Sequence, residues 1–344
     1  MKAVVLAAGK GTRMRGLCDE RPKPIMPLAN RPALSLTIER LAEAGIKDVL
    51  VIVGHRPEKI KETLARRPIP GVNISYEVQK GLNGTGEATM IAEGFVGGDA
   101  FVLTFGDVVA HSENYARAIK AFEQGADGVL STYDIGRAVK VGAVFVENNC
   151  VARIIERPGP DEAGPLVSAG LFIFPPQIFE ATRDLPPAPS GEHELTGGIQ
   201  KLVDAGCKLR AMPITGFWSN LTDPDALLEA NEHVERELVE KGEKLIDDAS
   251  DISPEATMRK TAAVARDARI GTGAILGRNV SIGRGSVVGE SCLLEHCIVL
   301  ENASIGNYSQ LENTIIDSGA NVPNGAILRS PAGHASIIWR TTYR

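Results

Sequence analysis

The first hundred residues alternate between short apolar runs and longer stretches in which apolar residues recur every three or four positions. Continuous or alternating apolar runs predict strands, and they lie at residues 3–6, 48–54, 72–79 and 100–107. Helical spacing lies between them, at residues 32–44, 57–67 and 84–95, and Gly45 is suited to end the first helix. Such alternation predicts a mostly parallel sheet covered by helices on both faces.

The pattern changes near residue 127, where short strand-like segments follow one another with little helix between them. This change predicts an antiparallel extension of the sheet, folded over the parallel part as a wall or lid. Residues 193–207 and 224–248 return to helical spacing, and the second of these is long and charged. We expect that helix to close a first domain over residues 1–245.

A period of six residues begins near Arg269 and holds for six repeats. Its apolar positions are Ile270, Leu276, Ile282, Val288, Leu294 and Leu300. Such a period is typical of hexapeptide repeats, which form a left-handed parallel β-helix. We therefore expect a linker over residues 246–262 and a short β-helix of three to four coils over 263–344. Open solenoid edges favour burial against another subunit, which predicts a homo-oligomer.

Composition narrows the possible partners. The chain of 344 residues is 43% hydrophobic, carries a net charge of −6 and has a pI near 5.7. It contains no long basic run and no apolar stretch of membrane-spanning length, so we expect neither nucleic acid nor membrane as a partner. The five cysteines are scattered and form no C-x-x-C pair, which indicates free thiols. Because the amino terminus begins directly with a strand, we expect a cytoplasmic protein, where thiols stay reduced.

The stretch that follows the first strand carries the first candidate chemistry. It reads LAAGKGTRMRG from Leu6 to Gly16, and RPKP follows from Arg21. Glycines let backbone amides approach an anion closely, and Thr12, Arg13 and Lys23 add a hydroxyl and two cations. This set suits a polyphosphate. It matches neither the Walker loop nor the dinucleotide fingerprint, because the required glycine and Lys-Ser/Thr positions are missing.

Further polar residues follow the other predicted strands. Gln79, Gly84, Thr85 and Asp107 come where parallel strands end. Ligands of open parallel sheets bind beyond these carboxyl ends. Asp107 is a candidate magnesium ligand, since magnesium bound to phosphates is held by only one or two protein oxygens.

The loop and the RPKP segment together closely resemble the signature of the sugar-1-phosphate nucleotidylyltransferases. That signature runs leucine-alanine-alanine-glycine-x-glycine-threonine-arginine and then proline-lysine-proline. The resemblance implies a Rossmann-like mixed sheet in the nucleotidyltransferase domain, with the β-helix after it. It also implies catalytic roles for Arg13 at the leaving pyrophosphate, Lys23 between phosphates and Asp107 at Mg²⁺. The nucleotide-binding residues it implies are Leu6, Ala7, Ala8, Gly9, Gly11, Thr12, Gln79, Gly84 and Thr85.

The same resemblance extends to the metal and the sugar. The segment from Trp218 to Pro224 resembles the family's tryptophan-x-aspartate segment, and Asn220 stands where many members have aspartate. Asn220 is therefore the expected second magnesium ligand, with Asp223 as its rival. The sugar-binding residues it implies are Gly142, Glu156, Arg157, Ser168 and Ala169. Arg157 replaces a usual lysine and Ser168 a frequent asparagine, which leaves the sugar open.

The predicted reaction joins a nucleoside triphosphate to a sugar 1-phosphate and releases pyrophosphate. Gln79 favours UTP or dTTP, and glucose 1-phosphate is the favoured sugar phosphate. One alternative is a catalytically silent regulatory or scaffold subunit of the same fold. Another is a bifunctional enzyme with acetyltransferase activity in the β-helix, for which His296 and His334 are the candidate bases.

Overall fold

The computed structural model describes residues 1–344 apart from 82, 139–141, 189–190 and 341–344. The chain forms two compact units. Unit 1 comprises residues 1–10, 21–25 and 34–218. Unit 2 comprises residues 11–20, 26–33 and 219–344, so it contains part of the glycine loop together with the carboxyl-terminal third of the chain.

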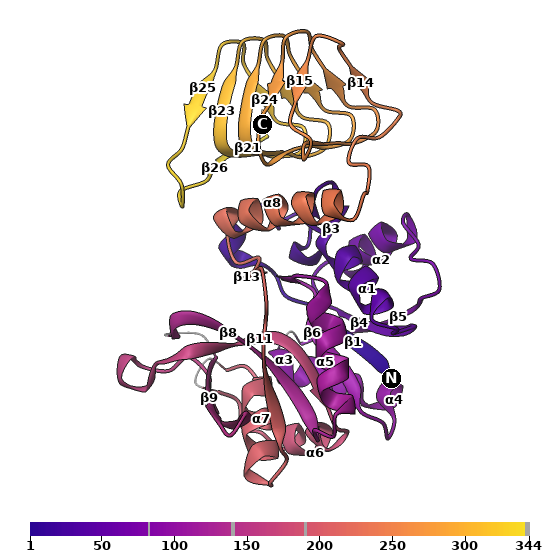
Figure 1. Ribbon diagram of the computed structural model, residues 1–344, viewed down its shortest axis with the longest axis vertical. Helices are drawn as coiled ribbons and strands as arrows, with labels where there is room; N and C mark the ends of the chain where they lie inside the picture. Colours follow the sequence, from indigo (N-terminus) through magenta and orange to yellow (C-terminus); the bar gives the residue numbers. More distant parts are fainter. Residues whose placement is uncertain (82, 139–141, 189–190, 341–344) are drawn as a thin grey trace. The chain divides into compact units, whose positions relative to one another are not determined.

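Unit 1 is built on a nine-stranded mixed sheet in the order β5-β4-β1-β6-β11-β8-β12-β10-β9 (Figure 1). Its parallel part consists of β1 (Lys2–Ala7), β4 (Asp48–Val53), β5 (Asn73–Val78) and β6 (Phe101–Phe105). The other strands are β8 (Gly128–Ala138), β9 (Ala143–Glu147), β10 (Cys150–Ile155), β11 (Gly164–Phe174) and β12 (Leu209–Pro213). The predicted α/β class with a mixed sheet is confirmed.

The two faces of this sheet bury two separate apolar cores because side chains alternate along each strand. In β1, Ala3, Val5 and Ala7 belong to one core, whereas Val4 and Leu6 belong to the other. The first core is covered by α1 (Ala33–Glu43), α2 (Pro57–Ala65) and α5 (Glu113–Glu123). The second is covered by α3 (Thr85–Ile91), α4 (Glu93–Val96), α6 (Gln177–Arg183) and α7 (Leu195–Asp204). Helices therefore lie on both faces, as predicted.

The antiparallel region continues the same sheet. Strand β11 pairs antiparallel with both β6 and β8, whereas β12 is parallel to β8. Strand β9 pairs with β10 and also with Leu166 and Val167, near the start of β11. This end of the sheet therefore bends back on itself. Two short strands, β7 (Val108–Ala110) and β13 (Trp218–Asn220), and the helices α5 and α6 were not predicted individually.

Unit 2 contains α8 (Pro224–Glu240) and stacked parallel strands. Helix α8 ends before the predicted Asp248, since Gly242 takes a φ of 78° directly after it. The small strands β2 (Pro27–Leu28) and β3 (Arg31–Pro32) form a hairpin in the same unit. In the stacked part, Ile252, Ile270 and Val288 pair at intervals of 18 residues, and Val288, Ile305 and Val322 at intervals of 17. The shorter interval shifts the six-residue period by one residue at Ile305, which lies five residues after Leu300.

The stacked strands form ladders of parallel pairs, which is consistent with the predicted β-helix (Figure 1). One ladder consists of β14 (Asp251–Ile252), β17 (Arg269–Ile270), β20 (Val287–Val288), β22 (Ser304–Ile305) and β24 (Asn321–Val322). A second follows β15 (Thr257–Met258), β18 (Ile275–Leu276), β21 (Leu293–Val299), β23 (Gln310–Ile316) and β25 (Ile327–Arg329). A third follows β16 (Ala263–Val264), β19 (Val280–Ile282), β21, β23 and β26 (Ser336–Ile338).

The stack begins earlier in the chain than the repeats indicate. Strands β14 and β15 lie inside residues 246–262, where the sequence predicted a linker, and Ile246 already pairs with Val264. The stack also has five strands in its first ladder, against the three to four coils expected. The sequence already carries this earlier start, because Ile246, Ile252, Met258 and Val264 continue the six-residue apolar period back from Ile270.

A buried polar network joins α8 to the stacked strands within unit 2. Asn231 donates to Asn279 Oδ1 over 2.7 Å and to Glu235 Oε1 over 2.9 Å. Ser281 donates to the same Glu235 oxygen over 2.9 Å, and Asn279 donates to the Leu228 carbonyl over 2.9 Å. Burial raises the pKa of Glu235 to about 8, in spite of these hydrogen bonds. Its carboxyl group is therefore largely neutral at pH 7.

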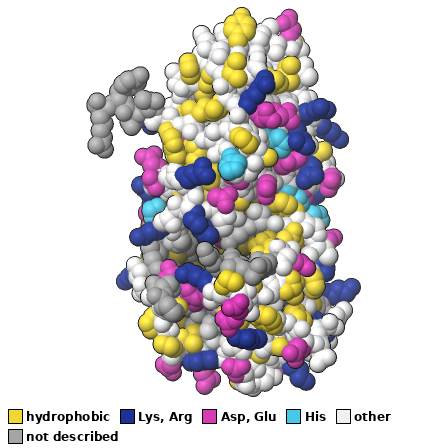
Figure 2. Space-filling view, turned by 90° about the vertical axis from the view of Figure 1, so that its left-hand side faces the viewer, with side chains coloured by type: hydrophobic (Ala, Val, Ile, Leu, Met, Phe, Trp, Pro, Cys, Tyr) yellow, Lys and Arg dark blue, Asp and Glu magenta, His cyan; other side chains and the backbone are white. Residues whose placement is uncertain are grey.

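The surface carries both charge signs. Figure 2 shows lysine and arginine side chains interspersed with acidic ones over one face. Among the described residues, no helix combines the length and the apolar composition that a membrane span requires.

Candidate active site

The first part of the glycine loop is fixed by the ends of neighbouring strands in unit 1. Leu6, Ala7 and Ala8 are buried. The Leu6 carbonyl accepts a hydrogen bond from Gly106 over 2.9 Å, and the Ala8 carbonyl accepts one from His55 over 3.1 Å. The backbone after β1 is thus held on both sides, and Gly9 follows it in an exposed position with no neighbour where a side chain would be.

Lys23 and Asp107 meet at the end of β6. Lys23 begins the 3₁₀ turn η2 (Lys23–Ile25), and its Nζ forms an ion pair with Asp107 Oδ2. A Cβ at Gly106 would lie 3.3 Å from Pro24 Cβ, so the absence of a side chain there lets the turn pack closely on the strand end. The two charged side chains are 12% and 20% exposed. The pair is thus sheltered yet reachable by a substrate.

The second part of the loop belongs to unit 2. Gly11 has a φ of 70° and precedes the 3₁₀ turn η1 (Thr12–Met14), in which Met14 is buried while Thr12 and Arg13 are exposed. Exposure leaves the Arg13 guanidinium available to an anion. Carboxyl-terminal residues of unit 2 then contact the loop, because Arg15 Nη1 donates to the Ala335 carbonyl over 3.4 Å.

Gln79 lies buried at the end of β5, as the base-reading role requires of a fixed side chain. Its Nε2 donates to the Gly84 carbonyl over 2.9 Å and to Glu87 Oε2 over 2.8 Å. Both amide hydrogens are therefore used within the protein, which leaves Oε1 to accept from a ligand. The hydrogen bond from Gln79 is also the main reason that the pKa of Glu87 is lowered, so Glu87 stays ionised.

The Gly84–Thr85 turn is held by the segment that precedes α7. Gly84 has a φ of 104°, and a Cβ there would lie 2.5 Å from the His193 carbonyl oxygen. Only glycine fits this backbone. Thr85 Oγ1 accepts from the Leu195 amide over 3.0 Å. His193 Nδ1 lies 3.1 Å from the Leu185 carbonyl, which gives this histidine a structural contact.

Four of the five predicted sugar residues lie together. The Ser168 amide donates to the Gly142 carbonyl over 3.0 Å, and a Cβ at Gly142 would lie 3.4 Å from Glu156 Oε2. Thr196 Oγ1 donates to this Glu156 oxygen over 2.7 Å. Next to Ser168, the Ala169 carbonyl accepts from Trp218 Nε1 over 2.8 Å. These contacts fix one carboxylate beside a glycine, where a hydroxylated ligand finds room.

Arg157 lies next to acidic side chains. Its guanidinium is 3.5 Å from Glu194 and 3.8 Å from both Glu156 and Glu192. The residue is exposed and has a φ of 49°. Arg157 is therefore placed to steady the Glu156 carboxylate more directly than to contact a sugar itself.

The two candidates for the second magnesium ligand differ within unit 2. Asn220 Oδ1 is buried and has no hydrogen-bond partner among the described residues. Asp223 is the N-cap of α8, since its Oδ1 accepts from the Ala226 amide over 3.0 Å and its Oδ2 from Thr222 Oγ1 over 2.9 Å. A buried carbonyl oxygen without a partner fits a missing cation, whereas both Asp223 oxygens are already used.

In the described part of the chain, no group of three or more His, Cys, Asp and Glu side chains could hold a metal. A magnesium ion bound mainly to substrate phosphates needs fewer protein ligands than that. Taken separately, the Asp107 carboxylate of unit 1 and the Asn220 amide oxygen of unit 2 are each a kind of donor that magnesium accepts.

Comparisons with known proteins agree with this geometry. The nucleotidyl transferase family model matches residues 2–237, and the model named "GMPPB C-terminal domain" matches residues 245–337. The chain belongs to the sugar-1-phosphate nucleotidylyltransferase family. It is 30% identical over 328 residues to the glucose-1-phosphate thymidylyltransferase of Streptomyces griseus, covering 92% of each protein. It is 31% identical over 332 residues to the bifunctional protein GlmU of Methanococcus maripaludis, covering 94% of this chain and 75% of that protein.

Solved structures show the same fold. The crystal structure of a UDP-glucose pyrophosphorylase complexed with UDP-glucose superposes with a TM-score of 0.62 at 20% identity. The superposition covers 68% of this chain and 98% of that one. The family membership that the two signature segments predicted is confirmed by the family model over residues 2–237 and by the relatives at 30% identity or more.

The contacts of three residues near the predicted sites were not predicted from the sequence: Glu87, Thr196 and Trp218. Glu87 lies inside the segment from Gln79 to Ala88, but an acidic residue in a first helical turn is usual for any helix. Thr196 and Trp218 lie in segments that resemble family segments, but their contacts with Glu156 and Ala169 depend on the strand pairings and on the position of α7. No local pattern shows such contacts.

Proposed function

We propose that this protein transfers a nucleotidyl group from a nucleoside triphosphate to a sugar 1-phosphate. UTP or dTTP and glucose 1-phosphate are the favoured substrates. The observation that carries the proposal is the Lys23–Asp107 pair at the end of β6, beside the held backbone of Leu6 to Ala8. A cation, a carboxylate and a glycine loop at the carboxyl end of a parallel sheet suit phosphate chemistry and little else.

The pyrimidine preference is supported by Gln79. Because its amide nitrogen is engaged twice, the group it offers to a ligand is the acceptor Oε1. Uracil and thymine both present an N3–H donor on their pairing edge, flanked by two carbonyl oxygens. Cytosine and adenine present an unprotonated ring nitrogen there, which would face the Gln79 oxygen lone pair to lone pair. The arrangement therefore favours UTP and dTTP over CTP and ATP.

The sugar side is supported by Glu156 and its neighbours. A carboxylate held by Thr196 has lone pairs left to accept hydroxyl protons of a sugar. Glycine at 142 leaves room directly beside it. Glucose 1-phosphate offers adjacent equatorial hydroxyls for such contacts, and the relative from Streptomyces griseus carries a glucose-1-phosphate name.

The reaction needs no covalent enzyme intermediate. A phosphate oxygen of the sugar 1-phosphate forms a bond to the α-phosphorus, and the bond from that phosphorus to the bridging oxygen breaks. Pyrophosphate leaves with the electron pair. Lys23 neutralises phosphate charge, and Arg13 steadies the leaving group, so positioning and electrostatics supply the rate. Bound Mg²⁺, held by Asp107 and Asn220, would supply further charge neutralisation at the phosphates.

The test is a panel of nucleoside triphosphates and sugar 1-phosphates, read by pyrophosphate release with and without Mg²⁺. We expect turnover with UTP or dTTP and glucose 1-phosphate, and loss of turnover when the metal is chelated. Absence of turnover with every pair would favour the silent scaffold alternative instead.

The stacked coils contribute to assembly in this proposal. We propose that they form a left-handed β-helix, and that residues 1–245 and 263–344 act as catalytic and assembly domains. Ile275, Leu293 and Ile327 occupy corresponding positions of one ladder and are 45%, 39% and 68% exposed. Gln310 occupies the position between Leu293 and Ile327, so these exposed apolar side chains form an interrupted row. We propose that a second copy of the chain covers it. Light scattering of the full chain that gave a monomer mass would contradict it.

Acetyl transfer in the coils has weaker support. The relative named bifunctional GlmU motivates it. The ring of His296, one of the two candidate bases, has its Nδ1 3.0 Å from Asn279 Nδ2, within the network between α8 and the strands. This contact gives His296 a structural use. Release of free thiol from acetyl-CoA, measured with amino sugar phosphates, tests the activity directly.

A further inference from the structure

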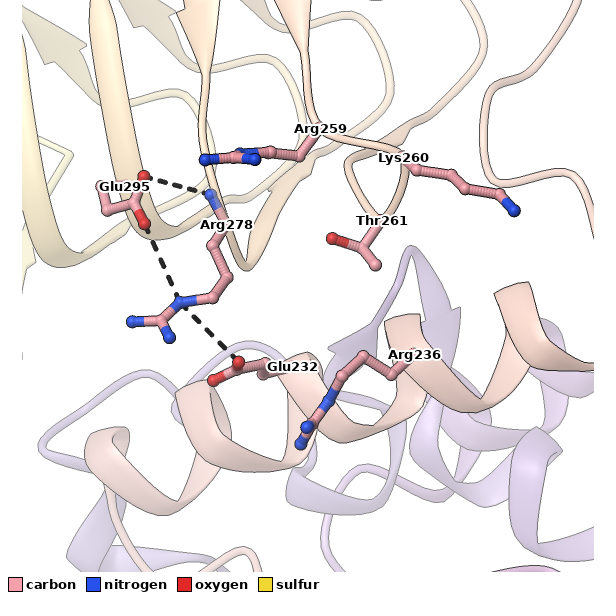
Figure 3. A pocket seen from close by; sticks show the side chains of 7 residues that line it. All are labelled: Glu232, Arg236, Arg259, Lys260, Thr261, Arg278 and Glu295. Atoms are coloured by element: carbon pink, nitrogen blue, oxygen red, sulfur yellow. Dashed lines mark hydrogen bonds and ion pairs between the residues drawn. The ribbon is translucent and has the colours of Figure 1, made fainter.

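A hollow of about 570 Å³ lies within unit 2, between α8 and the first coils of the strand stack (Figure 3). It is lined by Glu232, Arg236, Arg259, Lys260, Thr261, Arg278 and Glu295. Figure 3 shows Glu232 and Arg236 on the helix, with the other five side chains coming from the coils and Arg278 reaching towards the helix. None of these residues belongs to the candidate active site.

The lining contains more positive than negative charge. Two carboxylates share one cation, since Arg278 Nε lies 3.8 Å from Glu232 and 3.9 Å from Glu295. Arg236, Arg259 and Lys260 form no ion pair with an acidic side chain among the residues that the structure describes, although the whole chain carries a net charge of −6. Three uncompensated cations around one hollow repel one another, and a multiply charged anion would relieve that repulsion.

The walls of the hollow are held in place before any ligand arrives. Asn231 and Glu235, on either side of Glu232, are hydrogen-bonded to Asn279 and Ser281 of the adjacent coil. The Arg278 amide also donates to Glu295 Oε2 over 3.1 Å. A binding site with fixed walls loses less entropy when it takes up a ligand. Because the Glu235 carboxyl is largely neutral at pH 7, it adds little negative charge behind the cations.

The chemistry of the lining selects the class of ligand. Arginine guanidinium groups donate paired hydrogen bonds that match phosphate oxygens, and Thr261 adds a hydroxyl donor. A hollow of this volume accommodates a small molecule but not a folded partner or a duplex. We propose that this hollow is a binding site for a small phosphorylated anion, separate from the active site.

The proposal is independent of the transferase activity, so its test measures binding without turnover. Inorganic pyrophosphate is titrated calorimetrically into the Lys23→Ala protein in EDTA, because that substitution weakens phosphate binding at the active site. The comparison is the same protein carrying Arg236→Ala and Arg259→Ala. We expect the dissociation constant to rise at least tenfold in the latter, and binding to weaken as salt is added.

The matched control is Arg284→Ala, an exposed arginine of the same strand stack that does not line the hollow. It should leave the dissociation constant unchanged. Equal affinities with and without Arg236 and Arg259 would overturn the proposal, as would the absence of any pyrophosphate binding to the Lys23→Ala protein. Titrations with inorganic phosphate, glucose 1-phosphate and UDP-glucose distinguish the source of the phosphate group by which of them binds most tightly.

Discussion

The two units place their charged groups in different ways. In unit 1, Lys23 faces Asp107 and Arg157 faces three carboxylates, so each of these cations has an acidic partner near it. In unit 2, Arg236, Arg259 and Lys260 line one hollow and form no ion pair with any described acidic side chain, and Glu235 is buried in a network of neutral hydrogen-bond donors. Charge pairs at a sheet edge can exchange partners with an incoming substrate. The cations that line the hollow are available to bind an anion. The neutral carboxyl group of Glu235 contributes to packing instead.

This difference has a physical basis in solvation. A partly exposed ion pair keeps much of its hydration, so opening it to admit a polyphosphate costs little. The carboxyl group of Glu235, which is buried on helix α8, has no such hydration and therefore holds a proton. The ion pairs of unit 1 can therefore open and re-form when a charged ligand binds. The contact between α8 and the coils is instead held by a fixed hydrogen-bond network. The predictions below test each side of this comparison.

The largest expected effect is at the charge pair of unit 1. Lys23→Ala removes one preorganised charge contact, which typically costs about 10²–10³ in rate. The fold should persist, because the side chain of Lys23 lies on a short turn and is not part of either apolar core. Steady-state pyrophosphate release measures the rate, and circular dichroism the fold. Lys47→Ala, at an exposed lysine before β4, is the control. A Lys23→Ala rate within a few-fold of the parent would contradict the role.

The second effect concerns the metal donors. Asp107→Asn removes the one carboxylate of the proposed pair, so the Mg²⁺ concentration for half-maximal activity should rise about tenfold or more, and the rate should fall. Asn220→Asp adds charge at the same reach, and should tolerate or tighten magnesium. Both are read in magnesium titrations of activity.

Asp223 supplies the control for the metal prediction. Asp223→Asn keeps an N-cap acceptor for α8 and removes the charge, so magnesium dependence should change little. Asp223→Ala is less suited, because loss of a cap by itself costs about 1 kcal/mol of stability. If Asp223→Asn raised the magnesium requirement while Asn220→Ala did not, Asp223 would be the ligand and our assignment would be wrong.

The third prediction concerns the neutral carboxyl group of Glu235 in unit 2 and the pH dependence of the free energy of unfolding. Burial raises the pKa of Glu235 from its usual value of 4.5 to about 8, and the charge of the Glu232 carboxylate raises the pKa further. The folded state therefore holds a proton that the unfolded state releases above pH 4.5. The contribution of Glu235 to the free energy of unfolding is complete below that pH. It is lost as the pH rises towards 8, at about 1.4 kcal/mol per pH unit.

Glu235→Gln removes this proton linkage while keeping an acceptor for Asn231 and Ser281. Urea unfolding at several pH values between 5 and 9 should show the parent losing stability relative to the variant as pH rises. Glu240→Gln, at an exposed position of the same helix, should follow the parent. Parallel stability curves for the parent and Glu235→Gln would show that Glu235 is ionised in the folded protein.

The sequence predicted those elements whose apolar pattern runs without interruption. The apolar runs predicted β1, β4, β5 and β6 to within about two residues, and the six-residue period predicted stacked parallel strands. Binary patterning depends only on the local period, which is why these elements were visible. Helix α6 was missed because Gln177–Arg183 is only two turns long.

The site was predicted by residue type but not by its contacts. The signature loop and Asp107 are marked by their place after strands, whereas the two hydrogen bonds of Gln79 depend on the turn at Gly84. The sequence likewise did not indicate that Arg15 meets Ala335, which is 320 positions away. Contacts of such separation follow from how the coils end, and no local pattern encodes that.

The smallest expected effect concerns this distant contact within unit 2. The indole ring of Trp339 lies over Gly16, since a Cβ at Gly16 would be 3.3 Å from its Cη2, and the Ala335 amide donates to Asp225 Oδ1 over 2.9 Å. The end of the chain therefore braces the segment that carries Arg13. Trp339→Ala should loosen that segment and raise the KM for the nucleoside triphosphate about three- to tenfold, with a smaller change in kcat, because a looser loop weakens ground-state binding first. Trp339→Phe keeps a ring in place and should restore most of the affinity. Equal loss of kcat and thermal stability in both variants, without a change in KM, would mean that Trp339 supports the fold of the coils and not the loop.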